Sequence, residues 1–260
     1  MPLGEGPLVP ACGQLNECAV HGVAEGARSV LTFFAQDSGT HNLVYANADV
    51  SKAGQNREVI AFADHWKHTT GADPHMLIMD QKVTTQPILG ELNDRGITFL
   101  TLRMRSPTLI RQINALTPTD FTTITLDRPG DHNKPKVHES TSVHLTNYPG
   151  TVRQFIVTGL GRDAPTVIIT NDHTTPTKKL IERYARRMTI EQRLAEIIRA
   201  FHADALSSAV NLNVDLDITL VVLAQALTAA LAKRLPESPR RVRRLHVDRN
   251  YATPSILKPL

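Results

Sequence analysis

The stretch from Ile181 to Leu206 constrains the fold most, because it contains few helix breakers and repeats apolar residues at helical spacing. It predicts one long amphipathic helix that packs on the rest of the chain. Arg187 and Glu191 fall on the same inner stripe as the apolar residues of this helix. Since a buried charge costs free energy unless it is paired, both residues need either ion-pair partners or a functional role that offsets this cost.

Two interpretations of this pair are open. In the first, Arg187 and Glu191 form an ion pair, four residues apart, at the edge of the stripe. That pair is weak, and arginine before glutamate is the poorer order for the helix dipole. In the second, the two side chains serve a site at which the helix meets the remainder of the fold.

The spacing Tyr184-x-x-Arg187-x-x-x-Glu191 resembles the signature of a large group of DDE transposases of bacterial insertion sequences. The surrounding YARRMTIEQRLAEIIRAFHADALSS is also similar to that family's helix and its continuation. The resemblance implies a ribonuclease H-like core in which Glu191 is the third catalytic acid and Tyr184 and Arg187 contact DNA. One departure is plain: the group often has a lysine seven residues after the glutamate, and here that position is Ile198.

Asp80 follows His75–Met79, an apolar run that predicts a strand buried on both faces. Taken alone, Asp80 is a residue that caps the next turn. The stretch MLIMDQKVTTQPILGELNDRGITFLTLRMRS resembles the second-acid region of the same transposases, which implies that Asp80 is the second catalytic acid. Asp80 and Glu191 are 111 positions apart (191 − 80). This separation suits the subgroup with a β-rich insertion before the glutamate helix.

The resemblance implies DNA cleavage and strand transfer assisted by Mg²⁺ (or Mn²⁺), with Asp80 and Glu191 as metal ligands. Hard cations prefer carboxylate oxygens, and two such ions can stabilise both the attacking and the leaving oxygen of a phosphodiester. The family uses a further aspartate on the first core strand. Residues 1–27 hold no aspartate and no clean periodicity. We therefore expect a transposase that lacks its amino-terminal part and does not transfer strands at a useful rate.

The predicted fold class is α/β, a ribonuclease H-like mixed sheet with helices, interrupted by a β-rich insertion. We expect five segments, of which the insertion forms a separate lobe: 1–27 irregular, 28–104 first part of the core, 105–172 β-rich insertion, 173–236 helical second part of the core, and 237–260 a basic disordered tail. The core strands are predicted at Ser29–Ala35, Asn42–Ala48, His75–Met79 and Thr98–Arg103.

Composition limits the partners and the cellular compartment that we expect for this chain. The 260 residues carry a net charge of +4, which is compatible with DNA as a partner. Cys12 and Cys18 are the only cysteines, and residues 1–25 do not read as a secretory signal, so we expect a cytoplasmic, nucleoid-associated protein. The uncharged run Ile218–Ala232 predicts a buried helix and no membrane partner. No glycine-rich phosphate loop follows a predicted strand, which disfavours a nucleotide-binding enzyme.

Two functions remain open. The chain is either a DDE transposase, or an inactive remnant that binds DNA or a full-length transposase. A homo-oligomer is compatible with both.

Overall fold

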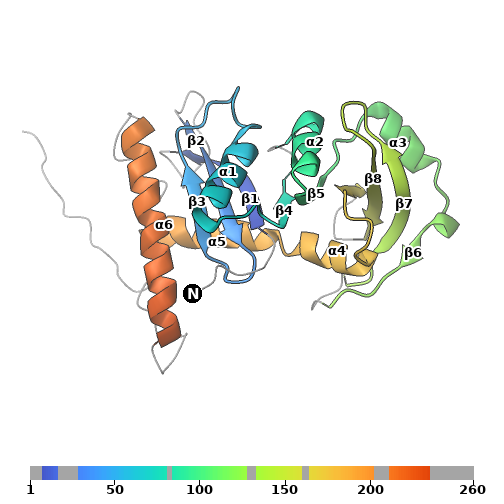
Figure 1. Ribbon diagram of the computed structural model, residues 1–260. Helices are drawn as coiled ribbons and strands as arrows, with labels where there is room; N and C mark the ends of the chain where they lie inside the picture. Colours follow the sequence, from blue (N-terminus) through green and yellow to red (C-terminus); the bar gives the residue numbers. More distant parts are fainter. Residues whose placement is uncertain are drawn as a thin grey trace, which may run out of the picture.

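The computed structural model describes residues 8–16, 29–80, 84–127, 133–159, 164–201 and 211–234. For residues 8–16, 29, 188, 189, 191–193 and 211 it describes the backbone alone. One sheet of nine strands runs through these residues, and helices cover both of its faces (Figure 1).

The first half of the chain forms β1 (Leu8–Asn16), β2 (Ser29–Asp37), β3 (Leu43–Asn47), α1 (Glu58–Thr70), β4 (Met76–Met79), α2 (Gln86–Asp94) and β5 (Thr98–Leu102). The second half forms α3 (Pro107–Asn114), the 3₁₀ helix η2 (Pro118–Asp120), β6 (Thr122–Thr123), β7 (Lys136–His144), β8 (Thr151–Thr158), β9 (Thr166–Thr170), α4 (Thr177–Ala185), α5 (Met188–Phe201) and α6 (Asn211–Arg234).

The strands lie in the order β3-β2-β1-β4-β5-β9-β8-β7-β6. β1 is antiparallel to β2 and parallel to β4, and β4 is parallel to β5. The remaining pairs are antiparallel. The chain therefore forms a mixed α/β sheet, as the sequence predicts, and the four predicted core strands all appear in it.

The predicted irregular segment over residues 1–27 is wrong for Leu8–Asn16, which form β1 in the interior of the sheet. The strand pairs with β2 along its whole length, from Leu8 opposite Asp37 to Asn16 opposite Ser29. Pro10 and Gly13 are poor strand residues, so local sequence gives no strand signal there. Pairing with a strand distant in sequence overrides that local preference.

The β-rich interval does not form a separate lobe, which corrects that prediction. β9 pairs with β5, so β9, β8, β7 and β6 continue the core sheet. The loop after β7 also packs on α2: the ring of Tyr148 meets Phe99 edge-on, and its hydroxyl donates to Asn93 Oδ1 at 3.0 Å. A Cβ on Gly90 of α2 would lie 2.9 Å from Cδ of Pro149, so only glycine allows this approach.

The single helix predicted from Ile181 to Leu206 is also wrong, because α4 and α5 are separate. Arg186 and Arg187 form a turn between them, and Ile190 N–H bonds to Arg187 C=O, only three residues back, at 3.1 Å. No glycine or proline marks this break, so the sequence carried no signal for it. The predicted residues beyond Phe201 lie outside the described part of the chain, as does the predicted tail 237–260.

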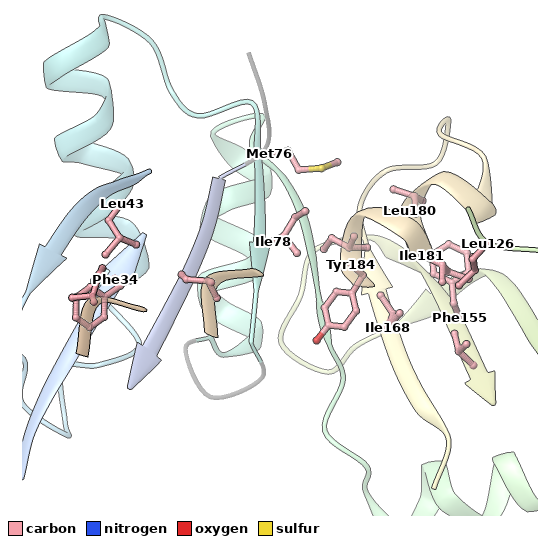
Figure 2. Close-up of a cluster of buried hydrophobic side chains, with 14 of the residues drawn as sticks. Phe34, Leu43, Met76, Ile78, Leu126, Phe155, Ile168, Leu180, Ile181 and Tyr184 are labelled. Carbon is pink, nitrogen blue, oxygen red and sulfur yellow. The ribbon is translucent and has the colours of Figure 1, made fainter. Parts of the chain in front are cut away.

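Alternate residues of the central strands pack into two hydrophobic cores, one on each face of the sheet. Leu77 and Met79 of β4 face α1 and α2, whereas Met76 and Ile78 face α4, α5 and α6. Figure 2 shows the second core, with Tyr184 between Ile78 of β4 and Ile168 of β9. The helices predicted to close the site thus pack on one face of the sheet.

α6 lies along the edge strand β3, at the end of the sheet opposite β6 (Figure 1). Val214 and Ile218 are buried, and Asp215 Oδ1 accepts a hydrogen bond from Ala48 N–H at 2.7 Å. By length and composition alone, Leu212–Arg234 could cross a membrane. The prediction of a fully buried helix is wrong, since only one face packs on the protein.

Candidate active site

Asp80 is the first residue after β4. It continues the alternation of Met76 and Ile78, so its side chain lies on the α4–α5 face. The side chain is about one-third exposed (33%). Carboxyl ends of parallel strands are common positions for functional groups in open α/β sheets, and β4 and β5 form such a parallel pair.

Arg187 is the residue that meets Asp80. Its Nη1 lies 3.7 Å from Asp80 Oδ2, and its side chain is only 9% exposed. The ion pair spans 107 positions (187 − 80), so no local sequence signal predicted it. The turn between α4 and α5 brings a charged side chain to the sheet while the flanking apolar residues stay packed.

Tyr184 lies one turn before Arg187, on α4, and is buried at 8% exposure. The Arg187 guanidinium carbon is 5.6 Å from the centre of the Tyr184 ring, within the range of a cation–π contact. The structure thus brings together three of the four candidate residues: Asp80, Tyr184 and Arg187. Both Tyr184 and Arg187 also have roles in the folded core.

Glu191 belongs to the first turn of α5, four residues after Arg187. Its side chain lies outside what the structure describes. Neither the predicted convergence of the Asp80 and Glu191 carboxyl groups nor the alternative Arg187–Glu191 ion pair is therefore tested. Ile198, where the transposase group often has lysine, packs against the core of the α4–α5 face.

β1 lies between β2 and β4, where the resemblance to transposases implies the first core strand, and its nine residues, LVPACGQLN, include no acid. Leu8 is level with Leu77 of β4. Carrying this parallel register three residues forward places Ala11 level with Asp80 (8 + 3 and 77 + 3). Ala11 is also paired with Phe34 of β2, a residue of the α4–α5–α6 core. Position 11 is therefore the place in β1 nearest to Asp80 by register.

The two candidate ligands from the sequence, Asp80 and Glu191, would suit one hard cation better than two. Mg²⁺ is usually held by one or two carboxylates together with water and phosphate, which Asp80 and Glu191 could supply. A second ion would need a further carboxylate, and β1 has none. Within the described residues, no three His, Cys, Asp or Glu side chains gather as a metal site. Arg187 also places a positive charge beside Asp80, the one candidate ligand whose side chain the structure describes.

A hydrogen-bonded turn positions α4. Oδ1 of Asp172 accepts from Thr174 N–H and Thr175 N–H, both at 2.9 Å, in the loop between β9 and α4. Burial raises the pKa of Asp172, but hydrogen bonds from the side chains and backbone of Thr175 and Thr174 outweigh burial and lower the pKa to about 2. Arg153, paired with Glu139 at 2.7 Å, holds the same loop by donating to Asp172 C=O at 2.9 Å.

No family model and no curated protein matches this chain. Among solved structures, the chain has a slight similarity to Argonaute of Marinitoga piezophila in complex with a 5′ OH guide RNA. That match has 8% identity and a TM-score of 0.28, and covers 69% of this chain and 25% of the other. The complex with guide RNA and target DNA gives 8% identity, a TM-score of 0.26, and coverage of 86% and 31%. The chain spans about a quarter to a third of those Argonaute chains, and similarity of this size carries neither a fold nor a ligand over to it.

Proposed function

We propose that this chain is a transposase of the DDE class, built on a ribonuclease H-like core, in which the site for DNA strand transfer is incomplete. The observation that carries the proposal is the contact between Asp80 at the end of β4 and Arg187 beside α5. Two sequence motifs suggested these residues independently, and the fold joins them across 107 positions. The four predicted core strands are all present, with α1 between β3 and β4 and α2 between β4 and β5.

The same geometry supports a role for Arg187 in DNA binding. An arginine fork suits phosphate oxygens, and phosphate contacts position a duplex without reading its sequence. Arg187 is held by Asp80 and by the face of Tyr184, so it is already ordered near the place where a scissile phosphate would bind. The proposed partner is DNA, and the proposed setting is the bacterial cytoplasm and its nucleoid.

The incomplete part of the site is on β1. Asp80 and Glu191 supply two carboxylates, and the position level with Asp80 on β1 is Ala11. Loss of one metal ligand leaves the coordination short, and a misplacement of about 1 Å can cost roughly a hundredfold in rate. We propose that the chain binds DNA ends and holds at most one Mg²⁺ or Mn²⁺, and does not transfer strands efficiently.

The test is to add the missing ligand. The variant Ala11→Asp should bind Mg²⁺ more tightly than the unmodified chain in a calorimetric titration. It should also gain cleavage or strand transfer on DNA that carries the ends of the insertion sequence encoding this chain. Ala11→Asn is the matched control, because it changes size similarly without adding a charge. The double change Ala11→Asp with Asp80→Asn should lose the gain. If Ala11→Asp changes neither Mg²⁺ binding nor activity while the fold is intact, the assignment of this site is wrong.

A homo-oligomer is the second part of the proposal, and α6 carries it. Six leucines spaced three or four residues apart on this helix are each more than half exposed: Leu212, Leu216, Leu220, Leu223, Leu227 and Leu231. An antiparallel pair of α6 helices from two copies would bury the leucines.

A further inference from the structure

A second concave site lies on the other face of the sheet. A pocket of about 430 Å³ opens between α3 and the strands β7 and β8. Its polar lining includes Arg103, Gln112, His138, Ser140, Ser142 and His144. Leu109 of α3 and Ile156 of β8, both buried, form part of its apolar wall.

Arg103 is the unusual member of this lining. It follows β5 and is half-buried, and the cost of taking its guanidinium out of water lowers its pKa. Its Nη1 donates to the neutral amide oxygen of Gln154. Within the described residues Arg103 forms no ion pair, whereas the buried Arg153 is paired with Glu139 and Arg95 with Asp73. A desolvated cation without an acid partner is satisfied by an anionic ligand.

The other polar groups around the pocket do not oppose an anion. His138 contacts Asp120 C=O through Nδ1 at 3.0 Å, and its Nε2 lies 3.4 Å from Ser140 Oγ. Both ring nitrogens therefore face protein groups, which fixes the ring. No acid stands among the described lining residues. The nearby Asp120 carboxylate is engaged by Thr117, accepting from its backbone N–H and its hydroxyl, both at 2.7 Å.

A β-bulge shapes the wall of the pocket. Ser140 is opposite Gln154 and Val143 is opposite Val152, so an advance of three residues along β7 matches an advance of two along β8. Bulges re-aim side chains and recur beside binding sites. Here the bulge spans residues 141 and 142, and Ser142 belongs to the lining.

We propose that this pocket binds a phosphate group, with the Arg103 guanidinium as its anchor and the Ser142 hydroxyl as a further donor, and that the group belongs to the backbone of DNA. An arginine fork matches two phosphate oxygens, and hydroxyls complete such sites. The assignment to DNA rests on the proposed transposase function, whereas the binding of phosphate does not.

The position of Arg103 favours DNA over a free phosphate. Met79 of β4 is level with Thr101 of β5, so Asp80 is level with Leu102, and Arg103 follows directly. Neighbouring strands are about 4.8 Å apart. Asp80 and Arg103 thus lie at the carboxyl ends of two neighbouring strands and on opposite faces of the sheet. A DNA strand that passes these strand ends could bind at both.

The main test compares Arg103→Met with Arg111→Met. Arg111 is an exposed arginine on the same side of the sheet, on α3, and does not line the pocket. Duplex DNA binding is measured by fluorescence anisotropy over a range of salt concentrations. Arg103→Met should weaken binding roughly threefold to tenfold and reduce the salt slope by about 1, as expected for one lost phosphate contact. Equal losses in the two variants, or no loss in Arg103→Met, would overturn the proposal.

A second measurement needs no variant and so does not depend on how Arg103→Met folds. Arg103 of the unmodified chain is labelled with phenylglyoxal, and the rate is followed by mass spectrometry of the peptide. Duplex DNA and inorganic phosphate should both slow the labelling of Arg103, and neither should protect Arg57. Protection by inorganic phosphate or a nucleotide, but not by DNA, would overturn the assignment to DNA. Protection by none of them would overturn the phosphate site.

The proposed function and this inference can fail separately. Failure of Ala11→Asp to gain Mg²⁺ affinity removes the transposase site and leaves protection of Arg103 by phosphate unchanged. Conversely, loss of the phosphate site leaves the response of Ala11→Asp unaffected.

Discussion

Arg187 has a structural role and a candidate functional role at the same time. Its guanidinium forms an ion pair with the Asp80 carboxylate and a cation–π contact with the Tyr184 ring, and the side chain is nearly buried. The sequence suggested Asp80, Tyr184, Arg187 and Glu191 because motifs preserve spacing along the chain. It suggested Glu191 or DNA as the partner of Arg187, and missed Asp80, because an ion pair between distant elements leaves no periodic trace. Arg103 was missed for the same reason, since the fold alone shows that it has no acid partner among the described residues.

Replacing Arg187 by glutamine should have two measurable effects. The free energy of unfolding should fall by about 1–2 kcal/mol, because a buried cation–π contact and a partly screened ion pair are lost. Mg²⁺ affinity at Asp80 should rise severalfold, because a positive neighbour no longer repels the ion. Chemical denaturation and calorimetric titration measure these two quantities.

The control for this change is Arg57→Gln. Arg57 and Glu91 form an ion pair at 2.8 Å, but the Arg57 side chain is 65% exposed, so its loss should cost under about 0.5 kcal/mol. Asp80→Asn should abolish the Mg²⁺ response. Unchanged Mg²⁺ affinity in Arg187→Gln would show that Asp80 is not a metal ligand.

At the scale of elements, sequence patterns located most of the secondary structure, and the exceptions have identifiable causes. The strand predicted at His75–Met79 forms over Met76–Met79, because a short apolar run of this kind is typical of a buried strand. β1 was missed because its pairing comes from distant strands. α3 was missed because it is short, although Ser106 followed by Pro107 is a helix-start signal, and the Ser106 hydroxyl accepts from Leu109 N–H at 3.2 Å.

The turn at Asp172 gives an element-scale prediction about pH. Because the pKa of Asp172 is lowered to about 2, its ionised form stabilises the folded chain. That contribution is complete above the unfolded pKa of about 3.9 and is lost as pH falls through about 2. Asp172→Asn should therefore reduce the free energy of unfolding by about 1 kcal/mol near neutral pH, after allowance for solvent screening.

Urea denaturation between pH 7 and pH 2 measures this difference. The unmodified chain and Asp172→Asn should differ by a constant amount from pH 7 to pH 5, and should converge below pH 4. Asp64→Asn, which removes an exposed carboxylate paired with Arg95, serves as a control for general charge effects. A difference that persists undiminished at pH 2 would show that the Asp172 charge does not stabilise the turn.

At the scale of the whole molecule, the β-rich interval is an extension of the core sheet. The sequence predicted its strands and could not predict their neighbours, because pairing of β9 with β5 depends on which edge of the core is free. β5 has β4 on one side, and β9 takes the other. At one end of the sheet α6 lies along β3, and at the other end the last strand is β6, which has two residues (Figure 1).

The exposed leucines of α6 lead to the last prediction, which concerns association. An apolar patch on the order of several hundred Å² exceeds what a monomer usually exposes. Pairing two copies would bury roughly 1,000 Å², the lower limit of a specific interface. The residues after Arg234 are rich in proline and arginine and contain no long apolar run that could cover the patch. We therefore expect the unmodified chain to sediment as a dimer at micromolar concentration.

Leu220→Glu combined with Leu227→Glu should sediment as a monomer, because glutamates facing each other in the pair carry an uncompensated charge. At protein concentrations low enough to dissociate the dimer, the double variant should keep the free energy of unfolding of the unmodified chain, since both side chains are more than half exposed in the single chain. Ile110→Glu, a change of the same kind at an exposed position on α3, should leave the dimer intact. A monomeric unmodified chain, or a dimer that survives both glutamates, would show that α6 is not the interface between copies.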